Sequence, residues 1–176
     1  MGLHNIAVYG TLLKGYPNCD YILDRHNGSV RFAGRGRTTK PARLVTLPPC
    51  YSPFLLDPTD RRSWYGALYQ VYVEVWEVDD RMLTSLDRLE MYDPTNPENS
   101  LYERRPICVT FENGDKTTAQ AYVLVDFIPE VLDLPTHPGY TDDVAATYVT
   151  MEQRVKWYGS KEGYVKMTLQ QWTTKL

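Results

Sequence analysis

Cysteine and histidine are scarce in this sequence of 176 residues, with three of each. Cys19, Cys50 and Cys108 form no Cys-x-x-Cys pair, and no histidine has a neighbour at the spacing of metal ligands. An odd, scattered set of cysteines argues against a disulfide framework and against a zinc site. We therefore expect three free thiols in a reducing cytoplasmic environment and no metal.

Long apolar runs and an excess of positive charge are also absent. No run of about 18 apolar residues occurs, so no helix is expected to cross a membrane. Residues 1–9 lack the basic and apolar pattern of a secretory signal. The net charge is −3, whereas nucleic-acid-binding proteins generally present a basic face to phosphate. These absences argue against membrane and nucleic-acid partners.

Several glycine signatures of catalysis are missing as well. The sequence has no GxSxG elbow, no phosphate-binding GxxxxGK[ST] loop and no GxGxxG dinucleotide fingerprint. Gly34 and Gly36 lie inside an expected strand, Val30–Thr39, where glycines are typical of a bulge or of a close backbone approach.

What the sequence does contain is a series of strand signals. The strongest runs from Trp64 to Val78, because apolar and polar residues alternate along it. Asn113-Gly114 separates two β-rich runs, which is typical of a hairpin. The strands expected are Ile6–Tyr9, Val30–Thr39, Leu44–Leu47, Phe54–Leu56, Trp64–Val78, Leu101–Phe111 and Lys116–Val125.

Helix signals are fewer. A short helix is expected around Tyr21–Leu23, and Asp79 can cap a second with an apolar stripe from Met82 to Leu89. Thr141 can cap a third, continuing to Val155, whereas Tyr164–Leu169 reads as a strand or a docked arm. Strands combined with two or three helices predict an α+β fold, and long bulged strands favour a small mixed β-barrel.

Two features stand out as candidate chemistry. The loop Tyr9–Gly15 follows a strand directly, and its backbone N–H groups can bind an anion, although an ordinary β-turn also explains it. Glu90 ends the second helix, where the helix dipole disfavours an acid, although a solvated surface glutamate also explains it.

Three ordered motifs then carry a resemblance. Residues 7–15 resemble the opening of the γ-glutamylcyclotransferase-like superfamily, which includes γ-glutamylamine cyclotransferases and AIG2-like proteins. Residues 66–90 resemble its strand–helix unit ending in a catalytic glutamate, and Leu101–Arg104 its tyrosine–arginine strand. The resemblance covers about Ile6 to Leu124, and it implies a small barrel with a cavity at one mouth.

The resemblance also implies an activity and its residues. The substrate's own α-amine would attack its γ-carbonyl, so 5-oxoproline and a free amine would form without a cofactor. Glu90 would be the acid/base, and its carboxyl would work best with a raised pKa. The implied substrate-binding residues are Tyr9, Gly10, Thr11, Leu12 and Tyr102.

Alternatives and departures remain. A non-catalytic AIG2-like binding module would keep the same pocket, and a related enzyme could remove γ-glutamyl groups from a carried intermediate. Val71–Val75 looks like an extension, loop 93–100 is long, and residues 126–176 match nothing in the resemblance. We expect one domain over residues 1–176 with its core at about 5–125, and a leaving-group rim formed by residues 93–100 and 128–140.

Overall fold

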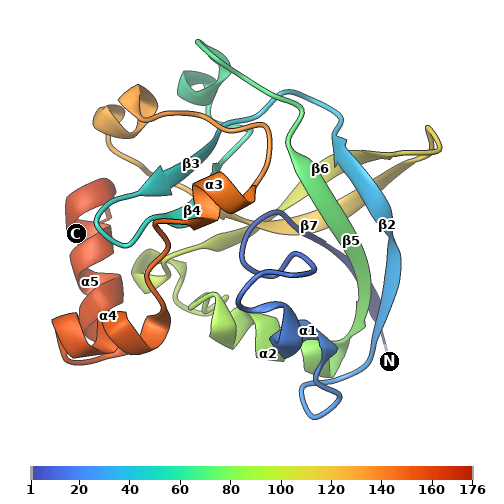
Figure 1. The fold of residues 1–176 in the computed structure, drawn as a ribbon, viewed down its shortest axis with the longest axis horizontal. Helices are drawn as coiled ribbons and strands as arrows, with labels where there is room; N and C mark the ends of the chain where they lie inside the picture. Colours follow the sequence, from blue (N-terminus) through green and yellow to red (C-terminus); the bar gives the residue numbers. More distant parts are fainter. Residues whose placement is uncertain (1, 176) are drawn as a thin grey trace.

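A closed barrel of five strands forms the centre of the computed structural model, which describes residues 2–175 (Figure 1). The strands follow one another around it in the order β1, β5, β2, β6 and β7, with antiparallel neighbours. One parallel contact, Ile6 with Gln120, joins β7 back to β1. The strands are β1 (Leu3–Val8), β2 (Val30–Thr38), β5 (Tyr72–Asp79), β6 (Glu103–Phe111) and β7 (Lys116–Leu124). The expected α+β barrel is confirmed.

Two further strands extend the barrel at β7. Strand β4 (Ser52–Leu56) runs parallel to β7, with Leu55 opposite Val123, and β3 (Leu44–Leu47) pairs antiparallel with β4. All five residues of β4 are buried, which agrees with its apolar sequence. Pro53 at the start of β4 therefore lies deep in the molecule, close to the N-terminal loop.

The glycines of β2 have the role expected from the sequence. The register of β2 against β5 shifts between Phe32 and Gly34, which marks a bulge. A Cβ atom on Gly36 would lie 2.4 Å from the carbonyl oxygen of Thr110 on β6, so only glycine allows the two strands to approach this closely. The bulge and the close contact help the sheet curve into a barrel.

Helices cover the barrel on two sides (Figure 1). Helices α1 and α2 lie together at one end, and α4 and α5 form a hairpin beside β3 and β4. The described chain thus has more helices than expected. They are α1 (Cys19–Leu23), α2 (Asp80–Leu89), α3 (Asp142–Ala145), α4 (Met151–Tyr158) and α5 (Lys161–Trp172), with 3₁₀ turns η1 (Arg61–Trp64), η2 (Pro97–Asn99) and η3 (Pro129–Asp133).

Three expectations about these elements are wrong. The strand from Trp64 to Val78 begins only at Tyr72, because Trp64 ends a 3₁₀ turn and Gly66 adopts a left-handed conformation with φ of 86°. The helix expected from Thr141 is two helices, α3 and α4, because the N–H of Val149 donates to the carbonyl of Cys50 and draws the chain aside. The segment Tyr164–Leu169 is helical within α5.

The apolar core includes residues of the barrel and residues of the C-terminal segment that follows β7. It joins barrel residues such as Ile6 and Val75 to Phe127, Tyr164 and Leu169, all at most 2 % exposed. The cysteines are free, with Cys19 and Cys50 buried and Cys108 exposed. Within residues 2–175, no helix has the length and apolar character needed to cross a membrane.

Candidate active site

Helix α2 fixes the position of Glu90. Its first turn is capped by the carboxylate of Asp79, which accepts a hydrogen bond of 2.7 Å from the N–H of Met82. Met82 and Leu86 bury one face of the helix against the barrel. Glu90 follows as the C-cap, and Met91 adopts φ of 54°, which ends the helix abruptly. The Glu90 side chain is thus held at a helix end that cannot continue.

An ion pair ties this helix to the barrel one turn before Glu90. The carboxylate of Asp87 lies 2.7 Å from Nε of Arg104 on β6. It also accepts a hydrogen bond of 2.6 Å from the hydroxyl of Tyr122 on β7. Asp87 and Arg104 are both largely buried, so the pair is sheltered from water and ions. The arginine of the tyrosine–arginine motif therefore positions the end of α2.

The loop after β1 supplies free backbone donors. The N–H of Leu13 donates to the carbonyl of Gly10, so residues 10–13 form a β-turn. Among the hydrogen bonds of residues 2–175, none takes up the N–H groups of Gly10, Thr11 or Leu12. The hydroxyl of Thr11 accepts from the side chain of Asn18 at 2.9 Å, which fixes the loop from behind. Three adjacent unpaired N–H groups are suited to an anion.

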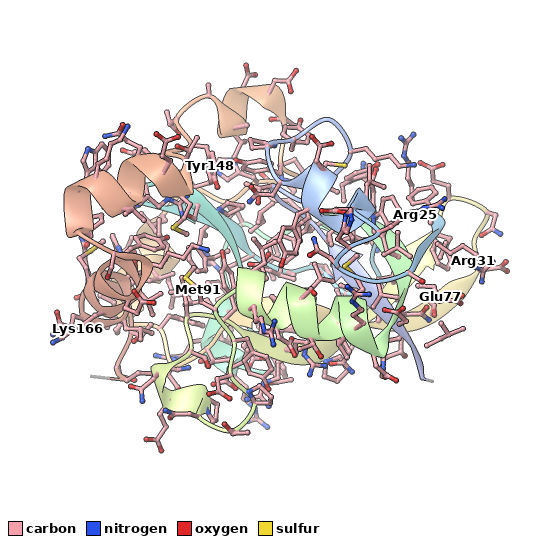
Figure 2. All side chains as sticks on the ribbon, turned by 90° about the horizontal axis from the view of Figure 1, so that it is seen from below. Arg25, Arg31, Glu77, Met91, Tyr148 and Lys166 are labelled. Carbon is pink, nitrogen blue, oxygen red and sulfur yellow. The ribbon has the colours of Figure 1, made fainter. Side chains whose placement is uncertain are left out.

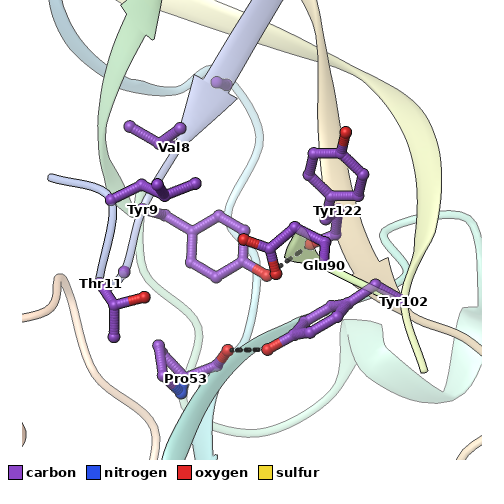
Figure 3. Close-up of a pocket in the computed structure, with 10 residues that line it drawn as sticks. Val8, Tyr9, Thr11, Pro53, Glu90, Tyr102 and Tyr122 are labelled. Atoms are coloured by element: carbon purple, nitrogen blue, oxygen red, sulfur yellow. Dashed lines mark hydrogen bonds between the residues drawn. The ribbon is translucent and has the colours of Figure 1, made fainter. Parts of the chain in front are cut away.

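A small cavity of about 30 Å³ brings these two features together (Figure 3). Glu90 points into it from α2, opposite Tyr9 and Thr11. Four further lining residues, Ala7, Val8, Pro53 and Tyr122, were not predicted from the sequence, because burial between a strand and a helix leaves no local pattern. The lining residues are Ala7, Val8, Tyr9, Gly10, Thr11, Leu12, Pro53, Glu90, Tyr102 and Tyr122. All six residues chosen from the sequence thus share one cavity.

The environment of Glu90 changes its acidity. Burial raises the pKa of Glu90 to about 7, and the positive charge of Arg154 opposes part of that rise. A carboxyl with this pKa gains and loses a proton readily near neutral pH. The solvated surface glutamate considered above does not describe this residue, which is half-buried beside aromatic rings.

Two tyrosines line the cavity with their rings, and their hydroxyls donate hydrogen bonds to backbone carbonyls. The Tyr9 hydroxyl donates to the carbonyl of Tyr122, and the Tyr102 hydroxyl donates to the carbonyl of Pro53 at 3.0 Å (Figure 3). Tyr102 also stacks on Phe54 with ring centroids 4.6 Å apart. Burial raises the pKa of both phenols, so they stay neutral and fixed. Loss of the Tyr102 ring would therefore affect the fold as well as the pocket.

A second cavity, of about 80 Å³, adjoins the first. The two share Thr11, Pro53, Glu90 and Tyr102. Half of the residues that complete its wall come from the C-terminal part of the chain. Those residues include Tyr148, Met151, Arg154, Lys161 and Tyr164.

The rim expected from residues 93–100 and 128–140 stays a prediction, and one of its residues, Asn99, lines a groove beside the second cavity. Neither segment lines either of the two cavities. The hairpin of α4 and α5 lines the second cavity, and Figure 2 shows it beside the end of α2, where Met91 lies between them. Among residues 2–175, no group of three or more His, Cys, Asp and Glu side chains is arranged to hold a metal ion.

Comparison with known proteins agrees with this architecture. The family model described as gamma-glutamyl cyclotransferase, AIG2-like, matches residues 6–141. The gamma-glutamylaminecyclotransferase C of Danio rerio is 32% identical over 161 residues, which cover 88% of this chain and 98% of that protein. The gamma-glutamylaminecyclotransferase of Homo sapiens is 35% identical over 145 residues, covering 78% of this chain and 90% of that protein.

A solved structure shows the same fold. The crystal structure of an AIG2-like protein from Mus musculus superposes with a TM-score of 0.66 at 33% identity, covering 80% of this chain and 90% of that one. The family match spans the barrel, α2 and every residue that lines the first cavity. The chain belongs to the gamma-glutamyl cyclotransferase, AIG2-like family.

Proposed function

We propose that this protein is a γ-glutamylamine cyclotransferase that converts a γ-glutamyl amine into 5-oxoproline and a free amine. The observation that carries the proposal is the Glu90 carboxyl, with a pKa of about 7, in a cavity that also exposes unpaired backbone donors. Relatives named as gamma-glutamylaminecyclotransferases support it.

The reaction needs one proton carrier and no enzyme nucleophile. The substrate's α-amine forms the new C–N bond with its γ-carbonyl carbon, and the bond from that carbon to the leaving amine breaks. Glu90 accepts the proton that the attacking amine releases and returns it to the departing amine. Acid–base catalysis of this kind contributes roughly 10²- to 10⁴-fold. The electrons and protons balance without water or a cofactor.

The loop of Gly10, Thr11 and Leu12 gives the substrate its orientation in this proposal. Its free N–H groups bind the α-carboxylate of the glutamyl moiety, and the rings of Tyr9 and Tyr102 confine the carbon chain. The α-amine is then held close to the γ-carbonyl. Closing a five-membered ring is a proximity problem, so a rigid holder lowers the barrier directly.

Two other functions were open from the sequence. A binding module with the same pocket has no need of a carboxyl poised near neutral pH, so Glu90 favours the enzyme. Removal of a γ-glutamyl group from a carried intermediate would use the same chemistry on a larger substrate. We propose free small molecules as substrates of a single-domain enzyme. The free thiols of Cys19, Cys50 and Cys108 support a cytoplasmic location.

The test is the substitution Glu90→Gln. Glutamine keeps the size and polarity of the side chain but carries no proton between amines, so kcat should fall by at least about 10²-fold. Formation of 5-oxoproline from γ-glutamyl-ε-lysine, γ-glutamyl amino acids and glutathione is followed by mass spectrometry.

The exposed glutamate Glu98 provides a matched control, because Glu98→Gln removes a carboxylate outside both cavities. It should leave kcat unchanged. A Glu90→Gln variant that is folded and keeps more than a tenth of the wild-type rate would contradict the role of Glu90. A wild-type protein that forms no 5-oxoproline from any of these compounds would contradict the enzyme itself.

A further inference from the structure

Arg154 on helix α4 is a buried cation without an anionic partner. Its side chain is 3% exposed, and none of the ion pairs formed by residues 2–175 includes it. Its Nε donates to the carbonyl of Val149 at 2.7 Å, but Nη2 is buried with no hydrogen-bond partner in the described chain. An uncompensated buried charge is costly, so such groups are usually paired or functional.

Two aromatic rings hold the guanidinium in place. Its central carbon lies 4.8 Å from the ring centroid of Tyr148 and 4.7 Å from that of Tyr164. Cation–π contacts of this kind fix the plane of the group without neutralising its charge. With Nε directed at Val149, the end of the fork formed by the two Nη atoms is left for another ligand.

Arg154 lines the second cavity, which begins at Glu90. Its charge acts on Glu90 directly, since it lowers the pKa that burial raises. In the proposed reaction the glutamyl moiety occupies the first cavity, and the leaving amine departs beside Glu90. The second cavity then receives the leaving group. Met91 and Lys161 also line a groove of about 540 Å³ between α2 and α5. The second cavity therefore adjoins a groove that leads toward the surface.

From this arrangement we infer that Arg154 binds a carboxylate on the leaving group, and that the preferred substrates are γ-glutamyl amines whose amine bears an acidic end. The inference rests on the proposed function. A carboxylate fits the planar fork of arginine with two parallel hydrogen bonds. It would supply the counterion that Arg154 lacks, and Lys161 adds a second positive charge to the same wall. Arg154 lies outside the part of the chain that the family model matches.

The test compares two substrates that differ only in charge. One is γ-glutamyl-4-aminobutyrate, and the other is the same compound with its terminal carboxylate replaced by a carboxamide. Shorter and longer ω-amino acids, each with its amide, locate the best chain length. At that length the wild-type protein should turn over the acid with a kcat/KM about 10- to 100-fold above that of the amide.

Substitutions at Arg154 then remove the preference. Arg154→Met should bring the acid-to-amide ratio close to one, and Arg154→Lys should keep a part of it, because the charge remains and the fork is lost. Lys156→Met is the matched control, since Lys156 is an exposed cation of the same helix as Arg154 and lines neither cavity nor the outer groove. It should leave the ratio unchanged. Thermal melting identifies variants that fail to fold.

The outcomes separate the inference from the function on which it rests. Equal turnover of acid and amide by the wild-type protein at every length would overturn the inference and leave the cyclotransferase intact. So would an unchanged ratio in folded Arg154→Met. If Arg154→Met shifts the pH profile of the rate equally for the acid and the amide and leaves their ratio unchanged, Arg154 only adjusts the pKa of Glu90. If none of the compounds forms 5-oxoproline, the proposed function itself is wrong.

Discussion

At the scale of the residue, Glu90 combines a catalytic advantage with a cost in stability. Its pKa is about 7 in the folded protein, against an ordinary value of 4.5, because burial disfavours the charged form. Below pH 4.5 the carboxyl is protonated in both the folded and the unfolded chain and carries no penalty. Between pH 4.5 and 7 the unfolded chain loses this proton while the folded protein keeps it, so stability falls across this window. Above about pH 7 both states are ionised and the loss stays constant.

Glu90→Gln should therefore be more stable than the wild type above pH 7, even though it is inactive. The gain should approach roughly 3 kcal/mol at pH 8 and vanish near pH 4, because the glutamine amide never ionises. Urea unfolding of both proteins at each pH measures it. Glu98→Gln serves as the control, since Glu98 is exposed and outside the site. A gain that is the same at pH 4 and pH 8 would contradict a raised pKa at Glu90.

At the scale of the element, the site depends on how the loop after β1 packs against β4. A Cβ atom on Gly10 would lie 2.5 Å from Cγ of Pro53, so glycine is required here for space. At its other end the loop is bound to the barrel, where the N–H of Lys14 donates to the buried carboxylate of Glu74 at 3.1 Å. The N–H groups of residues 10–12 are thus held in one place relative to Glu90.

Gly10→Ala should displace this loop and weaken the binding of the glutamyl α-carboxylate. A misplacement of about 1 Å costs on the order of 10²-fold in rate, so kcat/KM should fall by at least tenfold. Pro53→Ala removes the ring carbon that the new methyl group would meet. The double variant Gly10→Ala with Pro53→Ala should therefore recover much of the lost activity.

The complex with 5-oxoproline gives a direct view of the same contact. Its carboxylate should accept hydrogen bonds from the N–H groups of Gly10, Thr11 and Leu12. Binding of the carboxylate at any other position would contradict the role of this loop, and so would a Gly10→Ala variant with wild-type kcat/KM.

Elements also show where sequence reasoning succeeds and where it fails. Local patterns predicted the cap at Asp79, the hairpin at Asn113-Gly114 and the bulge in β2, because each depends on residues that are close in the chain. The break between α3 and α4 depends on a bond from Val149 to Cys50, about a hundred positions earlier. Contacts of that kind leave no periodic signal in either segment.

At the scale of the whole molecule, the candidate site is assembled from five distant segments. The loop after β1, Pro53, Glu90, Tyr102 and Tyr122 meet only when the barrel closes. The resemblance of the motifs identified the loop, Glu90 and Tyr102, whereas Pro53 and Tyr122 could be identified as lining residues only from the three-dimensional structure. The C-terminal helices could not be placed from the sequence, although Met151, Arg154, Lys161 and Tyr164 of α4 and α5 line the second cavity. The wall of the second cavity, which we propose contacts the leaving group, is therefore the part that sequence reasoning described least.

The shape of that wall leads to a prediction about substrate choice. Tyr102 and Tyr164 are buried and fixed by hydrogen bonds to Pro53 and Ser52, so the second cavity has rigid sides. The leaving group of glutathione begins at a branched carbon that carries both a side chain and a further residue. An unbranched amine passes between the rings without this bulk. We expect kcat/KM for slim γ-glutamyl amines to exceed that for glutathione by at least about tenfold, the effect of one to two kcal/mol of steric mismatch.

A series of γ-glutamyl compounds with leaving groups of increasing bulk measures this directly. The rate of 5-oxoproline formation should fall steadily as branching approaches the scissile bond, and bulk added farther along an unbranched chain should matter less. Tyr164→Phe is a useful companion, because it removes the hydroxyl that bonds Ser52 at 3.1 Å and loosens one side of the wall. It should reduce the discrimination against glutathione more than it reduces the rate with a slim amine. A flat profile across the series, or a preference for glutathione, would show that the α4–α5 hairpin does not select the leaving group.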